Sequence, residues 1–453
     1  MIMEILKRTD KCNLTERVLQ FGEGNFLRGF VDWMIDKLNK EADFDCGVVI
    51  IQPLPTGTCE MINEQDGLYT LYLRGLVNGE VMEETRIVEC VTRCINPYED
   101  WDQYIDCAAN PNLRFIVSNT TEAGIEYIQG QMTFPARLTK FLKARYDTGL
   151  NGFVILPCEL IDRNGDNLKN CVLSYAADWE LGDDFVDWIN NENHFTNTLV
   201  DRIVTGYPKD TASELEEKFG YLDKVIDTAE LFHLWVIEGD NKYSDELPFH
   251  KYGMNVIWTD DVSPYKIRKV RILNGAHTMM VPAAFMCGHQ TVGEALNDEI
   301  VCDFMYNGIF KEVIPTLDMP YDELKSFADD VVERFRNPFV KHYLSSILLN
   351  SVSKFQVRVL PSVLEYYKRY NKLPYRLIFS LAALIDFYRN GEPNDSEEIV
   401  NFMKTASTAE ILSKTAYWNC DLSFLGDTVE NTLADIEMKG MRKAMGDING
   451  YNK

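Results

Sequence analysis

The chain has 453 residues, of which 46% are hydrophobic and 12% aromatic, so it is long enough for two or three globular domains with their own cores. Its formal net charge of −25 disfavours nucleic acid and anionic membranes as partners, because both require a basic protein surface. No apolar run approaches the roughly 18 residues that span a bilayer, and residues 1–10 lack the pattern of a secretory signal, which favours the cytoplasm.

The first predicted element is a short apolar strand, 17–21, that runs into a glycine turn and then into a helical pattern at 30–38. A glycine pair at this place lets the backbone approach a pyrophosphate, whose charge the helix N-terminus stabilises. We therefore assign Gly22 and Gly24 to a dinucleotide site, although Leu27 stands where a third glycine is usual. The first helical turn adds three candidate cofactor-binding residues: Asn25, Phe26 and Arg28. Asn25 and Arg28 could contact phosphate, but an arginine there is also typical of a solvated surface.

A second buried strand, 47–52, completes a βαβ unit and ends at Gln52. An Asp or Glu at this position selects NAD by binding the ribose hydroxyls, whereas a nearby Arg favours the phosphate of NADP. Gln52 is neither, so NADP remains an alternative. The absence of Arg and Lys from residue 48 to residue 60 favours NAD.

The next segments alternate between strand and helix patterns. Strands are expected at 68–73, 86–91, 114–118 and 153–156, with a helix at 136–142. This alternation predicts an α/β fold with a Rossmann-type, doubly wound, mostly parallel sheet. Ser118 and Glu122 follow one of these strands at the sheet edge that binds ligands, so they are candidate cofactor contacts, and a capped loop without ligand has the same pattern.

The eleven cysteines are scattered, and none forms a Cys-x-x-Cys pair. Reduced thiols are the simplest interpretation. The nearest approach to metal-ligand spacing is Cys90-x-x-x-Cys94, but the chain has only six histidines and none lies close to this pair. We therefore predict no metal site.

The character of the sequence changes after about residue 260, where long amphipathic runs dominate. These runs are 266–286, 321–335, 338–349, 361–370 and 375–388. We expect a Rossmann-type dinucleotide-binding domain at 1–258 and a mostly α-helical substrate and catalytic domain at 259–453.

Residues 269–277 bring three polar side chains onto one helical face. At about 100° per residue, Lys269, Asn274 and His277 lie at roughly 0°, 140° and 80° around a helix axis. A partly desolvated lysine can exchange the proton of a secondary alcohol, an Asn amide can stabilise the developing alkoxide, and a histidine can orient hydroxyl groups. A basic amphipathic helix with a capping Asn and a core His has the same spacing, so spacing alone leaves both interpretations open.

The motif Lys269-x4-Asn274-x2-His277, together with Gly22-x-Gly24-Asn-Phe-x-Arg28, resembles the polyol-specific long-chain dehydrogenases, the mannitol dehydrogenase family. The similarity covers nearly the whole chain. Other stretches that carry it are 66–69, 121–124, 134–139, 157–165, 200–203 and 234–238.

The resemblance implies a nicotinamide-dependent, metal-independent dehydrogenase that acts as a monomer. It implies that Lys269 is the general acid/base and that Asn164 and Asn274 form an oxyanion hole. It further implies that His277 positions the substrate and that Asp201 modulates the lysine electrostatically.

Three stretches are similar to the branch of the family that acts on sugar acids: 19–33, 49–53 and 156–160. The expected partner is therefore a small hexuronate, reduced at its keto group to a hexonate. Its carboxylate needs a fixed cation in an otherwise acidic protein. Lys354 and Arg358 are the candidates, although either one alone is also typical of a surface residue.

Three rivals remain. A fructuronate (mannonate) or mannitol dehydrogenase of the same family would differ in substrate alone. A non-catalytic dinucleotide- or sugar-binding module would keep Gly22 and Gly24 but would not need Lys269, Asn274 and His277 on one face. A metal-dependent alcohol dehydrogenase would need more metal ligands than this sequence offers.

Overall fold

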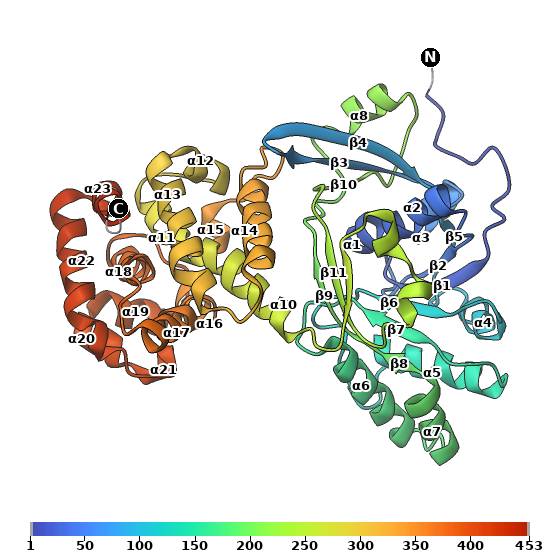
Figure 1. Ribbon diagram of the computed structural model, residues 1–453. Coiled ribbons are helices and arrows are strands. Elements are labelled where there is room, and N and C mark those ends of the chain that lie inside the picture. Colours follow the sequence, from blue (N-terminus) through green and yellow to red (C-terminus); the bar gives the residue numbers. More distant parts are fainter. Residues whose placement is uncertain (1–2, 451–453) are drawn as a thin grey trace. The chain divides into compact units, whose positions relative to one another are not determined.

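A computed structural model describes residues 3–450, which form two compact units (Figure 1). The first unit comprises the residues up to Arg74 together with Met82–Val262. The second comprises Gly75–Val81 and the residues from Ser263 onward. The backbone amide of Gly79 donates to a carboxylate oxygen of Glu333 at 2.8 Å. The tip of a β-hairpin therefore belongs to the second unit, which no sequence pattern indicated.

A six-stranded parallel sheet forms the centre of the first unit, in the order β5-β2-β1-β6-β7-β8. Its strands are β1 (Glu16–Phe21), β2 (Gly47–Ile51), β5 (Val91–Ile95), β6 (Phe115–Ser118), β7 (Val154–Pro157) and β8 (His194–Phe195). The predicted Rossmann-type sheet is thus confirmed. Because the strand order reverses at β1, the crevice at the carboxyl ends of β1 and its neighbours is the place where such a sheet binds ligands.

Both faces of this sheet are covered. Val18 of β1 belongs to a core that includes Met34 of α2 (Trp33–Ala42), whereas Leu19 faces the other core. That second core includes residues of α5 (Phe134–Asp147) and α6 (Asn164–Asp178). Both helices lie beside the sheet in Figure 1. Double-sided burial is the reason why these strands appear in the sequence as continuous apolar runs.

Two of the expected strands lie outside the main sheet. Strands β3 (Tyr69–Val77) and β4 (Glu80–Val88) form a separate sheet with β10 (Asp227–Ala229). The turn between them is Asn78-Gly79, and both residues have positive φ, which is the pattern of a tight hairpin. A third sheet contains β9 (Asn197–Asp201), β11 (Leu234–Glu238) and β12 (Val256–Thr259).

The second unit is mostly helical, as predicted. Its main helices are α10 (Ser263–Arg268), α11 (Gly275–Met286), α13 (Glu299–Gly308), α14 (Tyr321–Phe335), α16 (Ser351–Arg358), α17 (Leu360–Tyr370), α18 (Tyr375–Asn390), α22 (Gly426–Lys439) and α23 (Met441–Asn449). Nearly all of α11 is buried, which places this helix at the centre of the unit.

The expected helix at 338–349 is wrong for most of its length. Only α15 (Leu344–Ile347) is helical, and the residues before it run alongside 290–292. The amide of Val292 donates to the carbonyl of His342 at 3.0 Å, and the amide of Leu344 donates to that of Gln290 at 2.9 Å. Pairing with a distant segment provides hydrogen-bond partners for this backbone. Such pairing leaves no local periodicity in the sequence.

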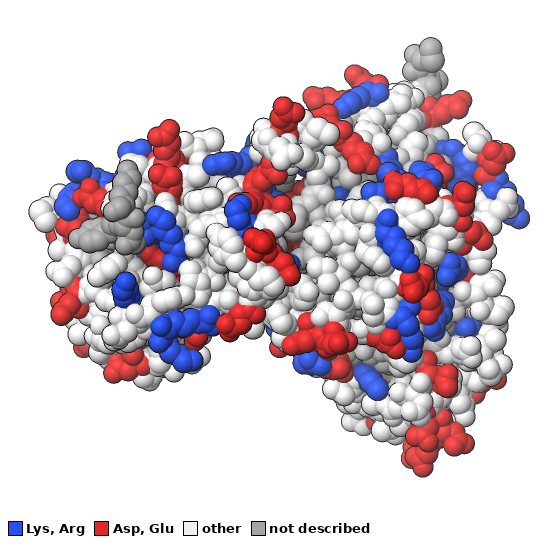
Figure 2. All heavy atoms as spheres, viewed as in Figure 1, with Lys and Arg blue, Asp and Glu red and all other residues white. Residues whose placement is uncertain are grey.

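The surface carries the charge expected from composition. Figure 2 shows acidic side chains over both units with basic ones interspersed. Among residues 3–450, no helix combines the length and apolar character needed to cross a bilayer. All eleven cysteines are free thiols.

Candidate active site

The glycine turn after β1 has the geometry of a phosphate-binding turn. Gly22 has φ of +128°, and a Cβ atom placed on it would lie 2.9 Å from the carbonyl oxygen of Asn119. Gly24 precedes the helical residues 25–42, and a Cβ atom there would meet nothing within 4 Å. The turn therefore requires glycine at position 22 and leaves open space above the helix N-terminus at position 24, where a diphosphate fits.

Arg28 is buried and supports the structure of the glycine turn. Its guanidinium donates to the carbonyls of Glu23 at 3.1 Å and Val225 at 2.6 Å, and to the amide oxygen of Asn25 at 2.7 Å. It also lies 5.0 Å from the centre of the Tyr69 ring. Arg28 thus holds the glycine turn in shape, so the surface alternative is wrong, and a direct phosphate contact stays a prediction. Phe26 stacks on Phe30, with ring centres 5.0 Å apart.

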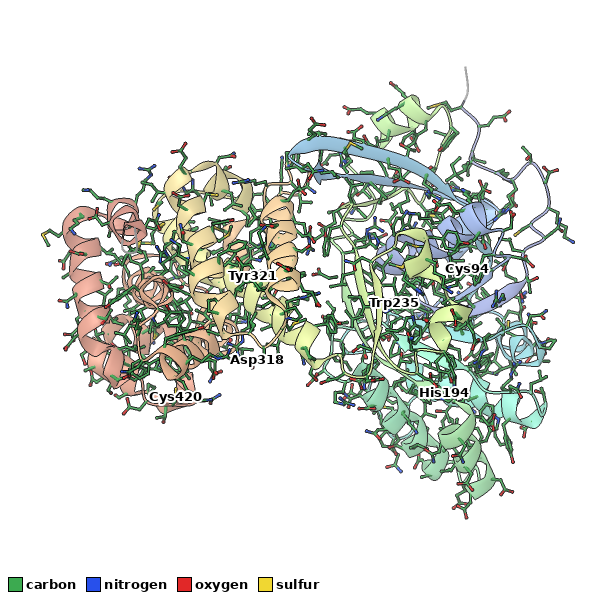
Figure 3. The ribbon with its side chains drawn as sticks, in the orientation of Figure 1. Cys94, His194, Trp235, Asp318, Tyr321 and Cys420 are labelled. Carbon is green, nitrogen blue, oxygen red and sulfur yellow. The ribbon has the colours of Figure 1, made fainter. Side chains whose placement is uncertain are left out.

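A groove of about 800 Å³ lies at the carboxyl ends of β2 and β5. The buried Gln52 shapes it, because its side chain donates to the carbonyl of Leu54 and accepts from the amide of Cys59. Cys94, labelled in Figure 3, is part of the lining. The lining residues include the carboxylates Glu60, Glu64, Glu99 and Asp100 and no lysine or arginine. A ribose with free hydroxyls suits this groove better than one that carries a phosphate.

Ser118 is tied to a buried carboxylate that the sequence reasoning missed. The Ser118 hydroxyl donates to Glu159 at 3.0 Å, and the amide of Thr120 donates to the other carboxylate oxygen at 2.9 Å. Burial raises the pKa of Glu159, and these hydrogen bonds oppose the shift. Glu159 therefore pins the loop after β6, while Glu122 lies exposed in the turn beyond it. The position of Glu159 in Pro157-Cys-Glu, directly after a strand, was the sequence signal that could have identified it.

Asn164 begins α6 and is buried. Its amide nitrogen has four acceptors within 3.3 Å, the carbonyls of Pro157, Glu159 and Thr198 and the Thr198 hydroxyl. Its oxygen accepts from the amides of Gly165 and Thr198. Because an amide has only two N–H hydrogens, this arrangement leaves none for an oxyanion. In this conformation Asn164 connects α6 to β7 and β9, and its expected place in an oxyanion hole stays a prediction.

Asp201 ends β9 and is paired with Leu234 of β11. Only 6% of it is exposed. Its predicted electrostatic effect on Lys269 stays a prediction.

In the second unit, Lys269 and Asn274 are the two ends of a π-helical turn, Lys269–Asn274. The amide of Gly275 donates to the carbonyl of Val270, five residues back, rather than only to nearer carbonyls. A wider turn brings residues five apart onto one side, whereas an α-helix would separate them by about 140°. Single π-turns inside α-helices are frequent at functional sites.

His277 lies one turn further on and is buried. Its ring stacks on Phe335, with centres 3.9 Å apart, and meets His342 edge-on at 4.8 Å. Burial lowers the pKa of His277 well below its usual value, and the charges of His342, Arg358 and Arg334 lower it further. The ring is therefore neutral near pH 7. Its Nε2 atom is buried without a partner among the described residues, as expected of a nitrogen that awaits a ligand.

Arg358 lies on α16 near this histidine. Lys354, one turn earlier on the same helix, donates to the carbonyl of Ile347 at 2.9 Å. The C-terminal end of α16 lies close to Gly275, since a Cβ atom on Gly275 would be only 3.2 Å from the carbonyl oxygen of Arg358. Burial lowers the pKa of Arg358, and burial and Arg358 together lower the pKa of Lys354. Within residues 3–450, Arg358 has no ion pair. A half-buried cation beside a second cation favours an anionic ligand.

Arg334 extends this positive group. His342 meets His277 with a ring that is neutral near pH 7, because burial lowers its pKa. Neither residue was predicted. Both act electrostatically on His277, and they reach it from α14 and from the extended segment before α15. Nothing in the local sequence indicates their approach.

Among the described residues, no group of three His, Cys, Asp or Glu side chains could hold a metal ion.

Comparisons with known proteins agree with this fold. Residues 16–251 match the model of the mannitol dehydrogenase Rossmann domain, and residues 261–438 match that of the mannitol dehydrogenase C-terminal domain. The chain is 45% identical to altronate oxidoreductases of Escherichia coli O17:K52:H18 and of Shigella flexneri, and each alignment covers 98% of this chain and 99% of the relative.

Two solved structures share the fold. D-sorbitol dehydrogenase in substrate-free form has a TM-score of 0.85 at 22% identity, covering 98% of both chains. Mannitol 2-dehydrogenase of Pseudomonas fluorescens, in a ternary complex with NAD and D-mannitol, has a TM-score of 0.68 at 20% identity, covering 99% of this chain and 97% of that one.

Proposed function

The chain belongs to the mannitol dehydrogenase family, and from that premise we propose that it interconverts D-tagaturonate and D-altronate with NAD as cofactor. The observation that carries this proposal is the 45% identity to altronate oxidoreductases along the full length of both proteins. The two neighbouring, half-buried cations Lys354 and Arg358 support a substrate that bears a carboxylate.

Lys269 acts as the proton donor and acceptor. During reduction, its ammonium group donates a proton to the keto oxygen as that oxygen becomes a hydroxyl, and during oxidation the free amine takes the proton back. The amide of Asn274, on the same side of the π-turn, donates a hydrogen bond to this oxygen and stabilises its developing charge. Asn164 supports the first unit by hydrogen bonds that connect α6 to β7 and β9.

His277 and the cations of α16 orient the substrate. The neutral ring of His277 is held between Phe335 and His342, so Nε2 is fixed for a hydrogen bond to a neighbouring hydroxyl. Arg358 and Lys354 bind the carboxylate by charge-assisted hydrogen bonds. Substrate binding thereby also offsets the repulsion between these two neighbouring cations.

The first unit provides the cofactor residues. Gly22 and Gly24 admit the diphosphate, and the groove beside Gln52 takes the adenosine. When bound, NADH supplies the hydride for reduction, and NAD accepts it in the opposite direction. Ser118 and Glu122 remain candidate contacts at the end of β6.

We place the protein in the cytoplasm and assign it as a monomer. Eleven free cysteines favour a reducing compartment. The family resemblance supports the monomer, and light scattering on the purified chain should give a mass near 52.1 kDa.

The deciding experiment follows NADH absorbance while tagaturonate, fructuronate or fructose is offered alone, with a chelator present. We expect fast oxidation of NADH with tagaturonate only. Preference for fructuronate or fructose would keep the family and the mechanism but overturn the substrate. No oxidation with any of the three, with NADPH tested as well, would point to a binding protein.

A further inference from the structure

The end of β2 lacks the acidic residue that usually binds the adenosine ribose, because Gln52 occupies that place. A carboxylate reaches the same place from the glycine turn. Glu23 stands between Gly22 and Gly24, and its Oε1 atom would lie 2.1 Å from a Cβ atom on Gly57. Gly57 belongs to the loop after β2 and lines the groove there. Its missing side chain makes room for the carboxylate.

The surroundings of Glu23 keep this carboxylate in place. Burial raises its pKa, whereas hydrogen bonds from the backbone amides of Glu23 and Thr58 and the charge of Arg28 lower it. The amide oxygen of Gln52 also approaches Gly57, since it would lie 2.6 Å from the same Cβ position. Glu23 and Gln52 thus converge on one point at the wall of the groove.

We propose that Glu23 takes the place of the acid that usually ends the second strand. Its carboxylate accepts hydrogen bonds from the ribose hydroxyls of NAD and repels the 2′-phosphate of NADP. The acidic groove lining acts in the same direction. This inference rests on the proposed function, because it assumes a nicotinamide dinucleotide in the crevice of the first unit.

The test measures the dissociation constants of NADH and NADPH by fluorescence titration of the full chain without sugar. Glu23→Gln keeps the size of the side chain and removes the charge. We expect the preference for NADH to fall by about tenfold to a hundredfold, the range of one hydrogen bond to a charged group. Glu41→Gln, at the far end of α2, removes the same charge and should leave the preference unchanged.

Equal weakening of NADH and NADPH by Glu23→Gln would overturn the proposal, since Glu23 would then only clamp two loops. If that variant is too unstable to titrate, Glu23→Asp decides, because the shortened carboxylate loses its ribose contact and the preference for NADH again falls. An unchanged ratio in Glu23→Asp contradicts a ribose contact. Failure of the wild-type chain to bind either nucleotide would refute the proposed function itself, whereas a different sugar preference would leave the ratio unaffected.

Discussion

Lysine catalysis requires that the lysine nitrogen and a second donor reach the same substrate oxygen. The bond from Gly275 to Val270 widens the turn between Lys269 and Asn274, and we expect this wider turn to bring both side chains to one substrate oxygen. The neutral His277 then lies one turn further along the same segment. These three candidate residues therefore lie within nine residues of sequence, whereas the candidate cations Arg358 and Lys354 come from α16.

Replacing Lys269 tests its role as proton donor and acceptor. Lys269→Ala should lower kcat by about two to four orders of magnitude, the range typical of a lost general acid/base. The dissociation constant of NADH, measured without sugar, should stay within about twofold, because the cofactor residues lie in the first unit. Lys266→Ala, one turn earlier, is the matched control and should retain most of its activity. A loss of less than about tenfold in Lys269→Ala would refute the assignment.

Arg358 allows a test of carboxylate recognition. Arg358→Met keeps much of the side-chain volume and removes the charge, so KM for tagaturonate should rise by about tenfold to a hundredfold. The KM for a neutral ketose should change little. Lys368→Met, on the exposed surface of α17, serves as the control for charge. Equal effects on the acidic and the neutral sugar would contradict the predicted contact.

At the scale of elements, burial on both faces made the parallel strands predictable, because Val18 and Leu19 must both be apolar. The segment 338–349 was not predictable, since it pairs with residues 290–292, far away in sequence. The π-turn at Lys269 was also invisible, because it depends on backbone hydrogen bonds. The Asn78-Gly79 hairpin, by contrast, carried a local signal that could have been used.

Gly275 tests how the packing of two helices sets the position of Arg358. In Gly275→Ala the new methyl group would lie 3.2 Å from the carbonyl oxygen of Arg358, so α16 must shift. We expect KM for tagaturonate to rise several-fold. In the control Gly293→Ala, also inside a helix, the methyl group meets nothing within 4 Å. That variant should keep the wild-type KM and gain up to about 1 kcal/mol of stability. An unchanged KM in Gly275→Ala would show that α16 does not need this close approach.

At the scale of the whole molecule, two buried carboxyls of the first unit that interact with Arg28 couple the stability of the protein to pH. Burial raises the pKa of Asp32 and of Asp227 from 3.8 to about 7, and both side chains are fully buried. The charge of Arg28 opposes both shifts but does not cancel them. Burial lowers the pKa of His233, in the same unit, from 6.5 to about 4.

The sign of the pH effect follows from proton binding in the folded and unfolded chains. Between pH 4 and 7 the two carboxyls bind more protons in the folded chain, so they lower the free energy of unfolding as pH rises. His233 binds fewer protons in the folded chain between pH 4 and 6.5, so its contribution has the opposite sign there and nearly ends above pH 6.5. Between pH 6.5 and 8 the carboxyls prevail, and stability should fall by roughly 1 kcal/mol.

Urea unfolding of the wild-type chain and of Asp32→Asn at pH 6.5 and pH 8 measures this effect. The variant replaces a carboxyl that must ionise inside the core by an amide that cannot, so its loss of stability over this interval should be less than half that of the wild type. Asp36→Asn, on the same helix, is the comparison, because Asp36 already pairs with Lys40 and Arg86 at 3.2 Å and should not alter the slope. If Asp32→Asn and the wild type lose equal stability, Asp32 does not titrate in this interval, and the pH response must come from other groups.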